Sequence, residues 1–185
     1  MKKLAIILIV IILALSVSLC ACSSKVNTQP VKIAVVYFSI TNNTKTVANY
    51  IADIKGADVF EIEAEVPYTP EDLSYEDNTN RSSREQADDT SRPQMKKAID
   101  LSQYGIVYIG YPIWHSKAPR ILYTFVESQE WGWTQIIPFC TSAETDIGES
   151  AILLKNLGHG GEWQEGKRFA ENATKSDVET WINSL

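Results

Sequence analysis

The chain has 185 residues, a formal net charge of −6 and three cysteines. This acidic balance, without any basic run, argues against nucleic acid and anionic lipid as partners and favours a basic protein partner or simple solubility. The length fits one domain with a sizeable core.

Residues 1–21 have the pattern of an export signal and not of a folded segment. Two lysines precede an apolar run that ends in small residues and cysteines. The run Leu-Cys-Ala-Cys that ends at Cys22 resembles a bacterial lipobox, which predicts Cys22 as the lipid anchor. We therefore expect residues 22–31 to be a polar tether and the protein to be exported, anchored to the outer face of the bacterial cytoplasmic membrane. The alternative is an uncleaved N-terminal helix.

The sequence offers little scope for disulfide bonds or metal binding. If Cys22 is acylated, Cys140 is the free thiol that remains, so no intrachain disulfide is available. Cys140 ends an apolar run, which is typical of a small packed side chain. No cluster of histidine, cysteine or carboxylate residues has metal-ligand spacing, so we expect no metal.

A strand, a polar turn and a helix open the folded part. Residues 33–38 are strand formers, and the apolar positions at 47, 48, 51 and 52 share one helix face, which Gly56 should end. Ser39, Thr41 and Thr44 therefore lie at a helix N-terminus, where free backbone N–H groups and the helix dipole favour an anion. These neutral donors suit a phosphate monoester. The alternative is that Thr41 or Thr44 only caps the helix.

The later elements alternate between strands and helices. The pattern predicts strands at 58–64, 106–109 and 135–140, with a weaker candidate at 162–169, and helices at 94–101, from Pro119 onward, at 149–157 and at the C-terminus. In the last helix, Ser176 and Glu179 are spaced as a capping box. Residues 65–92 are polar, acidic and too long for an ordinary connection, so we expect them to fold back over something or to be disordered.

This alternation predicts right-handed crossovers and a doubly wound parallel sheet. In such a sheet the loops 39–44, 111–115 and 141–146 should meet at one edge. The first loop can hold a phosphate, the second offers the aromatic face of Trp114, and the third offers hydroxyls and backbone amides. Together they suit a flat aromatic ring system that carries a phosphate.

The sequence resembles the flavodoxins and flavodoxin-like oxidoreductases over residues 32–185. The resemblance rests on three stretches in order, namely residues 37–44 (Tyr-Phe-Ser-Ile-Thr-Asn-Asn-Thr), 110–114 (Gly-Tyr-Pro-Ile-Trp) and 138–142 (Pro-Phe-Cys-Thr-Ser). It implies a three-layer α/β/α fold, with a five-stranded parallel sheet of order 2-1-3-4-5. It also implies that FMN binds noncovalently at the carboxyl edge of the sheet.

Residue by residue, the resemblance implies three groups of contacts to the cofactor. The FMN phosphate would be held by Ser39, Thr41, Asn42, Asn43 and Thr44. The isoalloxazine would lie along Pro112, Ile113 and Trp114, with His115 beside them, and Thr141, Ser142 and Ala143 would close its other side. No residue is assigned a catalytic role, because the flavin supplies the redox chemistry. Trp131, Trp133 and Trp163 are interpreted as packing or rim aromatics.

The expected function is electron transfer, or reduction of a small acceptor such as a quinone, by a flavin protein at the membrane surface. The alternative is a flavodoxin-like binding module that has lost FMN and has no redox activity. A hydrolase that uses Ser39 or Ser142 receives little weight, since neither serine has a suitably placed histidine.

Overall fold

The computed structural model describes residues 30–74 and 77–185. Within them, Val31–Leu185 form one compact unit. The predicted export signal and Cys22 lie outside the described residues. No helix in the described part of the chain is long and apolar enough to cross a membrane.

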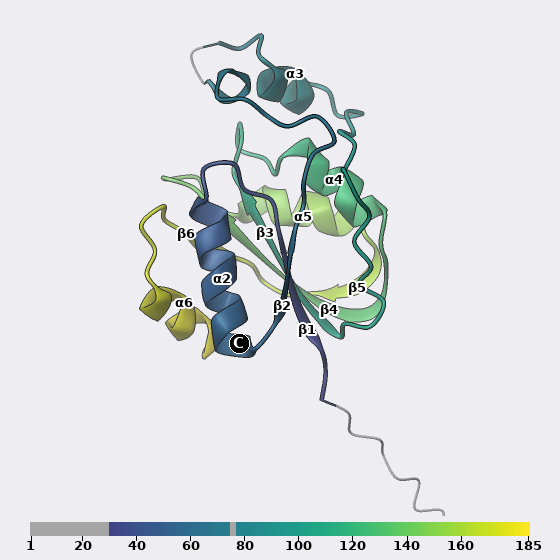
Figure 1. Ribbon diagram of the computed structural model, residues 1–185, viewed down its shortest axis with the longest axis vertical. Helices are drawn as coiled ribbons and strands as arrows, with labels where there is room; N and C mark the ends of the chain where they lie inside the picture. The colour runs from purple at the N-terminus through teal and green to yellow at the C-terminus, as the bar shows by residue number, and fades with distance from the viewer. Residues whose placement is uncertain (1–29, 75–76) are drawn as a thin grey trace, which may run out of the picture. The chain divides into compact units, whose positions relative to one another are not determined.

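A parallel sheet forms the centre of the unit (Figure 1). Its strands follow the order β2-β1-β3-β4-β5. β6 pairs with the C-terminal end of β4, after the residues of β4 that pair with β5. The order 2-1-3-4-5 implied by the resemblance is therefore confirmed. The strands are β1 (Ile33–Tyr37), β2 (Asp58–Glu61), β3 (Ile106–Pro112), β4 (Glu130–Thr141), β5 (His159–Trp163) and β6 (Lys167–Phe169).

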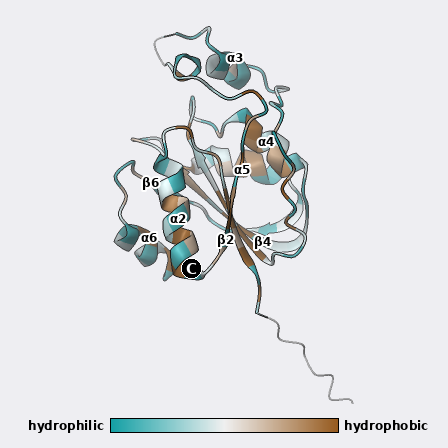
Figure 2. Ribbon diagram, viewed as in Figure 1, coloured by the Kyte–Doolittle hydropathy of each residue, from teal (hydrophilic) through white to brown (hydrophobic). Residues whose placement is uncertain are grey.

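Helices cover both faces of this sheet (Figure 1). Helices α2 (Asn43–Lys55) and α6 (Lys175–Ile182) cover one face, and α4 (Arg120–Glu127) and α5 (Gly148–Leu157) cover the other. Strands β1 and β3 and the second half of β4 are mostly apolar, and the helices carry polar residues on their outer sides (Figure 2). This pattern is expected of a sheet that is buried on both faces.

Strand β4 tolerates Pro138 in its interior because of where the missing N–H would point. The N–H of Gln135 donates to Gly105 on the β3 side, so the nitrogen of Pro138, three residues later, faces the opposite side of the strand. On that side β5 pairs up to Ile136 and β6 pairs only from Phe139 onward. Pro138 thus falls in the gap between two partner strands, where no ladder donor is needed.

The long connection after β2 is ordered where it is described. It contains the short 3-10 helix η1 (Glu71–Leu73) and the helix α3 (Arg81–Ala87), and α3 is largely hydrophilic (Figure 2). The predicted helix at 94–101 is wrong. No helix forms there, because the backbone pairs with the segment after β2: the Glu65 N–H donates to the Gln94 carbonyl and the Lys96 N–H donates to the Glu63 carbonyl. Ile99 and Leu101 are buried.

Three further expectations need correction. The strand predicted at 58–64 ends at Glu61, and the candidate at 162–169 is two short strands, β5 and β6. The capping box of the last helix is made by Thr174 and Asp177 and not by Ser176 and Glu179, since Thr174 accepts from the Asp177 N–H and the Asp177 carboxylate accepts from the Thr174 N–H.

Candidate functional site

The carboxyl edge of the sheet carries a cavity of about 600 Å³. All three predicted loops contribute to it. Nine of the twelve predicted site residues line it, namely Thr41, Asn43, Pro112, Ile113, Trp114, His115, Thr141, Ser142 and Ala143. Topology therefore brings together residues that are distant in sequence, as expected for the crevice of a doubly wound sheet.

The turn after β1 leaves the N-terminus of α2 uncapped. Asn42 is the N-cap residue, with a left-handed φ of 67°, which asparagine tolerates better than most residues. Its side chain makes no capping hydrogen bond, and the first helical N–H with an acceptor is that of Thr46, which donates to Asn42 at 2.9 Å. The idea that Thr41 or Thr44 caps the helix is wrong. The amides of the first turn remain available to an anion.

The remaining predicted residues of this turn lie outside the cavity lining. Thr44 is buried, and its hydroxyl lies 2.7 Å from that of Thr141 at the end of β4. Ser39 lines a separate hollow of about 200 Å³ beside β2, and Asn42 lines neither. Of the five predicted residues of this turn, Thr41 and Asn43 therefore line the cavity, whereas Thr44 is buried and contacts the end of β4 through Thr141.

Lys45 is engaged elsewhere. Its ammonium group lies 3.2 Å from Glu61, and the Tyr37 hydroxyl donates to the same carboxylate at 2.7 Å. Burial first, and then the hydrogen bond to Glu61, hold the pKa of Tyr37 well above its usual value. Because Lys45 is paired, an anion at the turn would depend on neutral donors and the helix dipole.

The second loop forms a tight hairpin after β3. Trp114 and Lys117 exchange backbone hydrogen bonds of 2.9 and 3.0 Å, and the two residues between them, His115 and Ser116, both have positive φ. Trp114 lines the cavity, but it is only 8% exposed, because Phe38 and Tyr68 pack edge-on against it with ring centroids at 5.5 and 5.2 Å. The broad aromatic face expected from the sequence is thus largely covered.

The connection containing η1 and α3 supplies a wall that the sequence did not reveal. Leu73 and Ser82 line the cavity. Gln86 holds the connection in place by donating to the carbonyls of Trp114 and Ala118, each at 3.1 Å, and the Ser83 hydroxyl lies 3.4 Å from Nε2 of His115. Tyr68 and Leu73 within 65–92 were the available signal, and they indicated that the segment folds back without indicating its target.

Buried charge also fixes this wall. Arg120, only 2% exposed, donates to the carbonyls of Glu85 and Gln86 at 3.1 and 3.0 Å. Its third partner is the carboxylate of Asp89, and this hydrogen bond lowers the pKa of Asp89 below its usual value. The start of α4 is therefore joined to the end of α3, so the wall is part of the fold and not a loose loop.

The charge within the cavity is negative. Glu144 and Glu171 line it, and its lining contains no lysine or arginine. Glu171 was missed from the sequence because it follows β6, which joins the edge of β4 only in three dimensions. In the described part of the chain, no group of three or more histidine, cysteine, aspartate and glutamate side chains could hold a metal ion.

Comparisons with known proteins agree with this geometry. A family model described as flavodoxin matches residues 32–185. A candidate flavoprotein from Bacteroides uniformis ATCC 8492 is 35% identical, with a TM-score of 0.79 over 84% of this chain and 99% of that one. One from Bacteroides eggerthii DSM 20697 is 34% identical, with a TM-score of 0.78 over 84% and 98%.

A more distant match extends the fold comparison. A flavoprotein in complex with FMN from Lactobacillus acidophilus NCFM is 20% identical, with a TM-score of 0.58 over 83% of this chain and 99% of that one, which shows a shared fold. No curated protein matches the chain.

Proposed function

Because the chain belongs to the flavodoxin family, we propose that residues 32–185 bind FMN noncovalently in the cavity at the carboxyl edge and use it to transfer electrons. The comparisons support FMN as the cofactor. The acceptor would be a protein partner, with a basic surface if it docks by charge, or a small molecule such as a quinone.

The uncapped N-terminus of α2 is the observation that carries this proposal. The amides of Asn43, Thr44 and Lys45 have no acceptor among the described residues, and the helix is 13 residues long, so its dipole is fully developed. Thr41 and Asn43 add side-chain donors at the cavity wall. A phosphate monoester fits this donor set better than a triphosphate, since no free lysine or arginine lines the cavity.

The remaining walls fit a flat ring system. Pro112, Ile113 and Trp114 offer an apolar side, and the third loop offers the backbone N–H groups of Ala143 and Glu144 on the other, which have no acceptor among the described residues. When bound, the isoalloxazine of FMN would supply the electron chemistry. The protein would hold the cofactor in place, keep water from part of the ring through Trp114, and set the local charge through Glu144 and Glu171.

The proposed location follows from the N-terminal pattern alone. We propose that the protein is exported and that lipid on Cys22 anchors it to the outer face of the bacterial cytoplasmic membrane. Residues 22–31 would then act as a polar tether that lets the domain reach a membrane quinone or a neighbouring protein.

A second candidate function is a binding module that retains the fold without the flavin. Two observations favour it, namely the coverage of Trp114 by Phe38 and Tyr68 and the negative charge of the cavity. The covered tryptophan leaves less aromatic surface for an isoalloxazine, and the two carboxylates would disfavour an electron-rich reduced flavin.

The absorbance spectrum of purified residues 23–185, with and without added FMN, separates the two candidates. The proposal expects visible flavin absorbance that remains with the protein on gel filtration. A colourless protein that retains no added FMN would support the binding module. Retained colour that is lost only on denaturation would support noncovalent FMN.

A further inference from the structure

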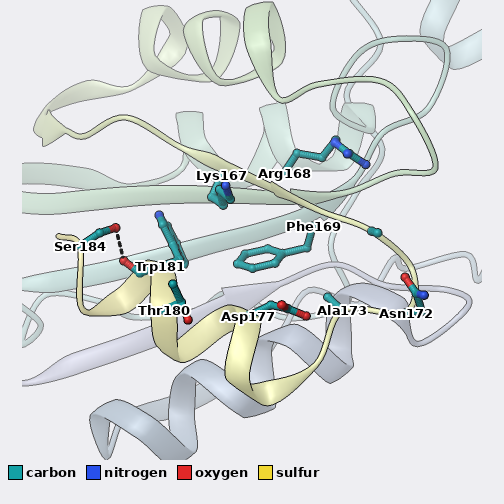
Figure 3. Close-up of a pocket in the computed structure, with 10 residues that line it drawn as sticks. Lys167, Arg168, Phe169, Asn172, Ala173, Asp177, Thr180, Trp181 and Ser184 are labelled. Carbon is teal, nitrogen blue, oxygen red and sulfur yellow. Dashed lines mark hydrogen bonds between the residues drawn. The ribbon is translucent and has the colours of Figure 1, made fainter.

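The last strand, β6, presents its residues to two different sides. Phe169 packs against Trp181 with ring centroids 5.4 Å apart. Lys167, Arg168 and Phe169 all line a hollow between β6 and α6, but the side chain of Arg168 extends away from Phe169 and α6 (Figure 3). The alternation of side chains along a strand explains this arrangement. The side chain of Arg168 therefore lies on the opposite side of β6 from α6, where it meets the loop that follows β4.

Arg168 binds the backbone of this third loop at two points. Its Nη1 donates to the carbonyl oxygens of Ser142 at 2.9 Å and of Ala143 at 3.2 Å. The backbone of β6 adds a third contact, because the Ser142 N–H donates to the Phe169 carbonyl at 3.1 Å. The loop that would lie beside the isoalloxazine is thus held to β6 by the hydrogen bonds of the Arg168 guanidinium and by one backbone hydrogen bond.

This arrangement fixes the direction of two backbone donors. In a trans peptide the N–H points opposite to the C=O of the same peptide group. The carbonyls of Ser142 and Ala143 point to Arg168, so the N–H groups of Ala143 and Glu144 point away from it. Neither N–H has an acceptor among the described residues. Ala143 and Glu144 both line the cavity, so these donors are available to a ligand there.

We propose that Arg168 is a positioning residue for the cavity. By holding two carbonyl oxygens of the third loop, it presents the N–H groups of Ala143 and Glu144 to a ligand edge that carries negative charge. Its own positive charge offsets part of the charge of Glu144. If the ligand is FMN, as the proposed function holds, the ligand edge at these N–H groups would be the pyrimidine edge, which becomes electron-rich on reduction. Arg168 therefore stabilises the reduced cofactor over the oxidised one.

Lys167→Met is a matched control for Arg168→Met. Both changes remove one positive charge from β6 and keep an unbranched side chain, but Lys167 faces the hollow beside α6 (Figure 3). Arg168→Lys is the intermediate variant, because lysine keeps the charge but lacks the planar fork of guanidinium donors. Arg168 is only partly buried, and Arg168→Lys provides a second folded variant if Arg168→Met is unstable.

The first measurement uses the flavin-free protein. Amide exchange of Ser142, followed by NMR, reports whether the loop stays fastened to β6. We expect exchange to be about tenfold faster in Arg168→Met than in Lys167→Met, as loss of a charged hydrogen bond allows more frequent opening. Equal exchange in these two variants would overturn the positioning role, whether or not FMN binds.

The second measurement uses the FMN-loaded protein. We expect Arg168→Met to have a lower flavin reduction potential than Lys167→Met and to bind FMN and riboflavin about tenfold more weakly, with equal losses for the two ligands because the phosphate turn is unchanged. Arg168→Lys should recover part of the potential. Equal potentials in the two methionine variants would overturn the proposal. Failure of the wild type to bind FMN would overturn both the proposed function and FMN as the ligand that the third loop recognises.

Discussion

The hydroxyl oxygens of Thr44 and Thr141 lie 2.7 Å apart in the protein interior. Thr44 is in the first turn of α2, and Thr141 is the last residue of β4. The pair joins the proposed phosphate turn to the loop beside the proposed flavin ring. Thr44→Val or Thr141→Val would leave the partner hydroxyl buried without a hydrogen bond.

Each of these single changes should lower the free energy of unfolding by about 1–3 kcal/mol. The double change should cost less than the sum of the two, since it leaves neither hydroxyl unpaired. Urea denaturation of the four proteins gives the coupling energy. Thr180→Val, at an exposed helical site, should change stability little, and additive losses at Thr44 and Thr141 would mean that the hydroxyls do not interact.

Cys140 should be unreactive in the folded protein. It is fully buried, and this burial, followed by repulsion from Asp146, raises the pKa of its thiol to about 12. Because the unfolded thiol ionises at lower pH, the neutral thiol contributes stability below about pH 9, and this contribution is lost as the pH rises toward 12.

Two measurements on residues 23–185 check this prediction. A thiol reagent at about pH 8 should modify Cys140 only after urea is added. Between about pH 9 and 11, the stability of the wild type should fall more steeply than that of Cys140→Ala. Rapid modification of the folded protein would show that the thiol is accessible.

The sequence predicted most of the scaffold because its signals were local. The apolar runs of β1 and of the core of β4 end in polar residues, and the run of β3 ends in Gly-Tyr-Pro. Loops at the carboxyl ends of parallel strands necessarily meet. Nine predicted residues accordingly line one cavity. Thr44 lies at the helix N-terminus, as the sequence indicated, but it is buried against Thr141, which lies far along the chain, and it does not line the cavity.

The wrong or missing predictions concern contacts that only the folded chain creates. The segment 94–101 has helix-forming residues, but no helix forms there because the backbone of Lys96 pairs with that of Glu63. Leu73 and Ser82 reach the cavity because Gln86 and Arg120 fasten the connection above it. No local pattern specifies such an arrangement.

Glu144 should lower the reduction potential of bound flavin. The residue is exposed and lines the cavity, and a carboxylate disfavours electrons added to a nearby ring. At a separation of about 8 Å and an effective dielectric of about 40, one charge contributes roughly 1 kcal/mol, or about 40 mV per electron. Glu144→Gln should therefore raise the potential by tens of millivolts.

Redox titration at low and high ionic strength measures this effect. The shift should shrink at high salt, because the carboxylate is solvated. Glu149→Gln, on the first turn of α5 and absent from the cavity lining, is a control of equal charge. A potential that is unchanged or lowered in Glu144→Gln would place the carboxylate away from the ring.

Processing of the N-terminus should depend on Cys22. Cys22→Ser should leave an unprocessed precursor without lipid, whereas Cys20→Ser should still be processed, as the alanine before Cys22 fits the lipobox. Metabolic labelling with a fatty acid and the mobility of the protein on a gel report both events. Normal maturation of Cys22→Ser would mean that the anchor lies elsewhere or that the segment is not cleaved.

Titration of FMN and of riboflavin into residues 23–185 tests the central claim most directly, because the two ligands differ only in the phosphate. We expect FMN to bind more tightly than riboflavin, and Thr41→Ala to weaken FMN by about 1–3 kcal/mol with little effect on riboflavin, since the lost hydrogen bond goes to a charged group. Thr180→Ala should change neither affinity. Equal affinities for FMN and riboflavin, or equal losses of both in Thr41→Ala, would contradict a phosphate held at the N-terminus of α2.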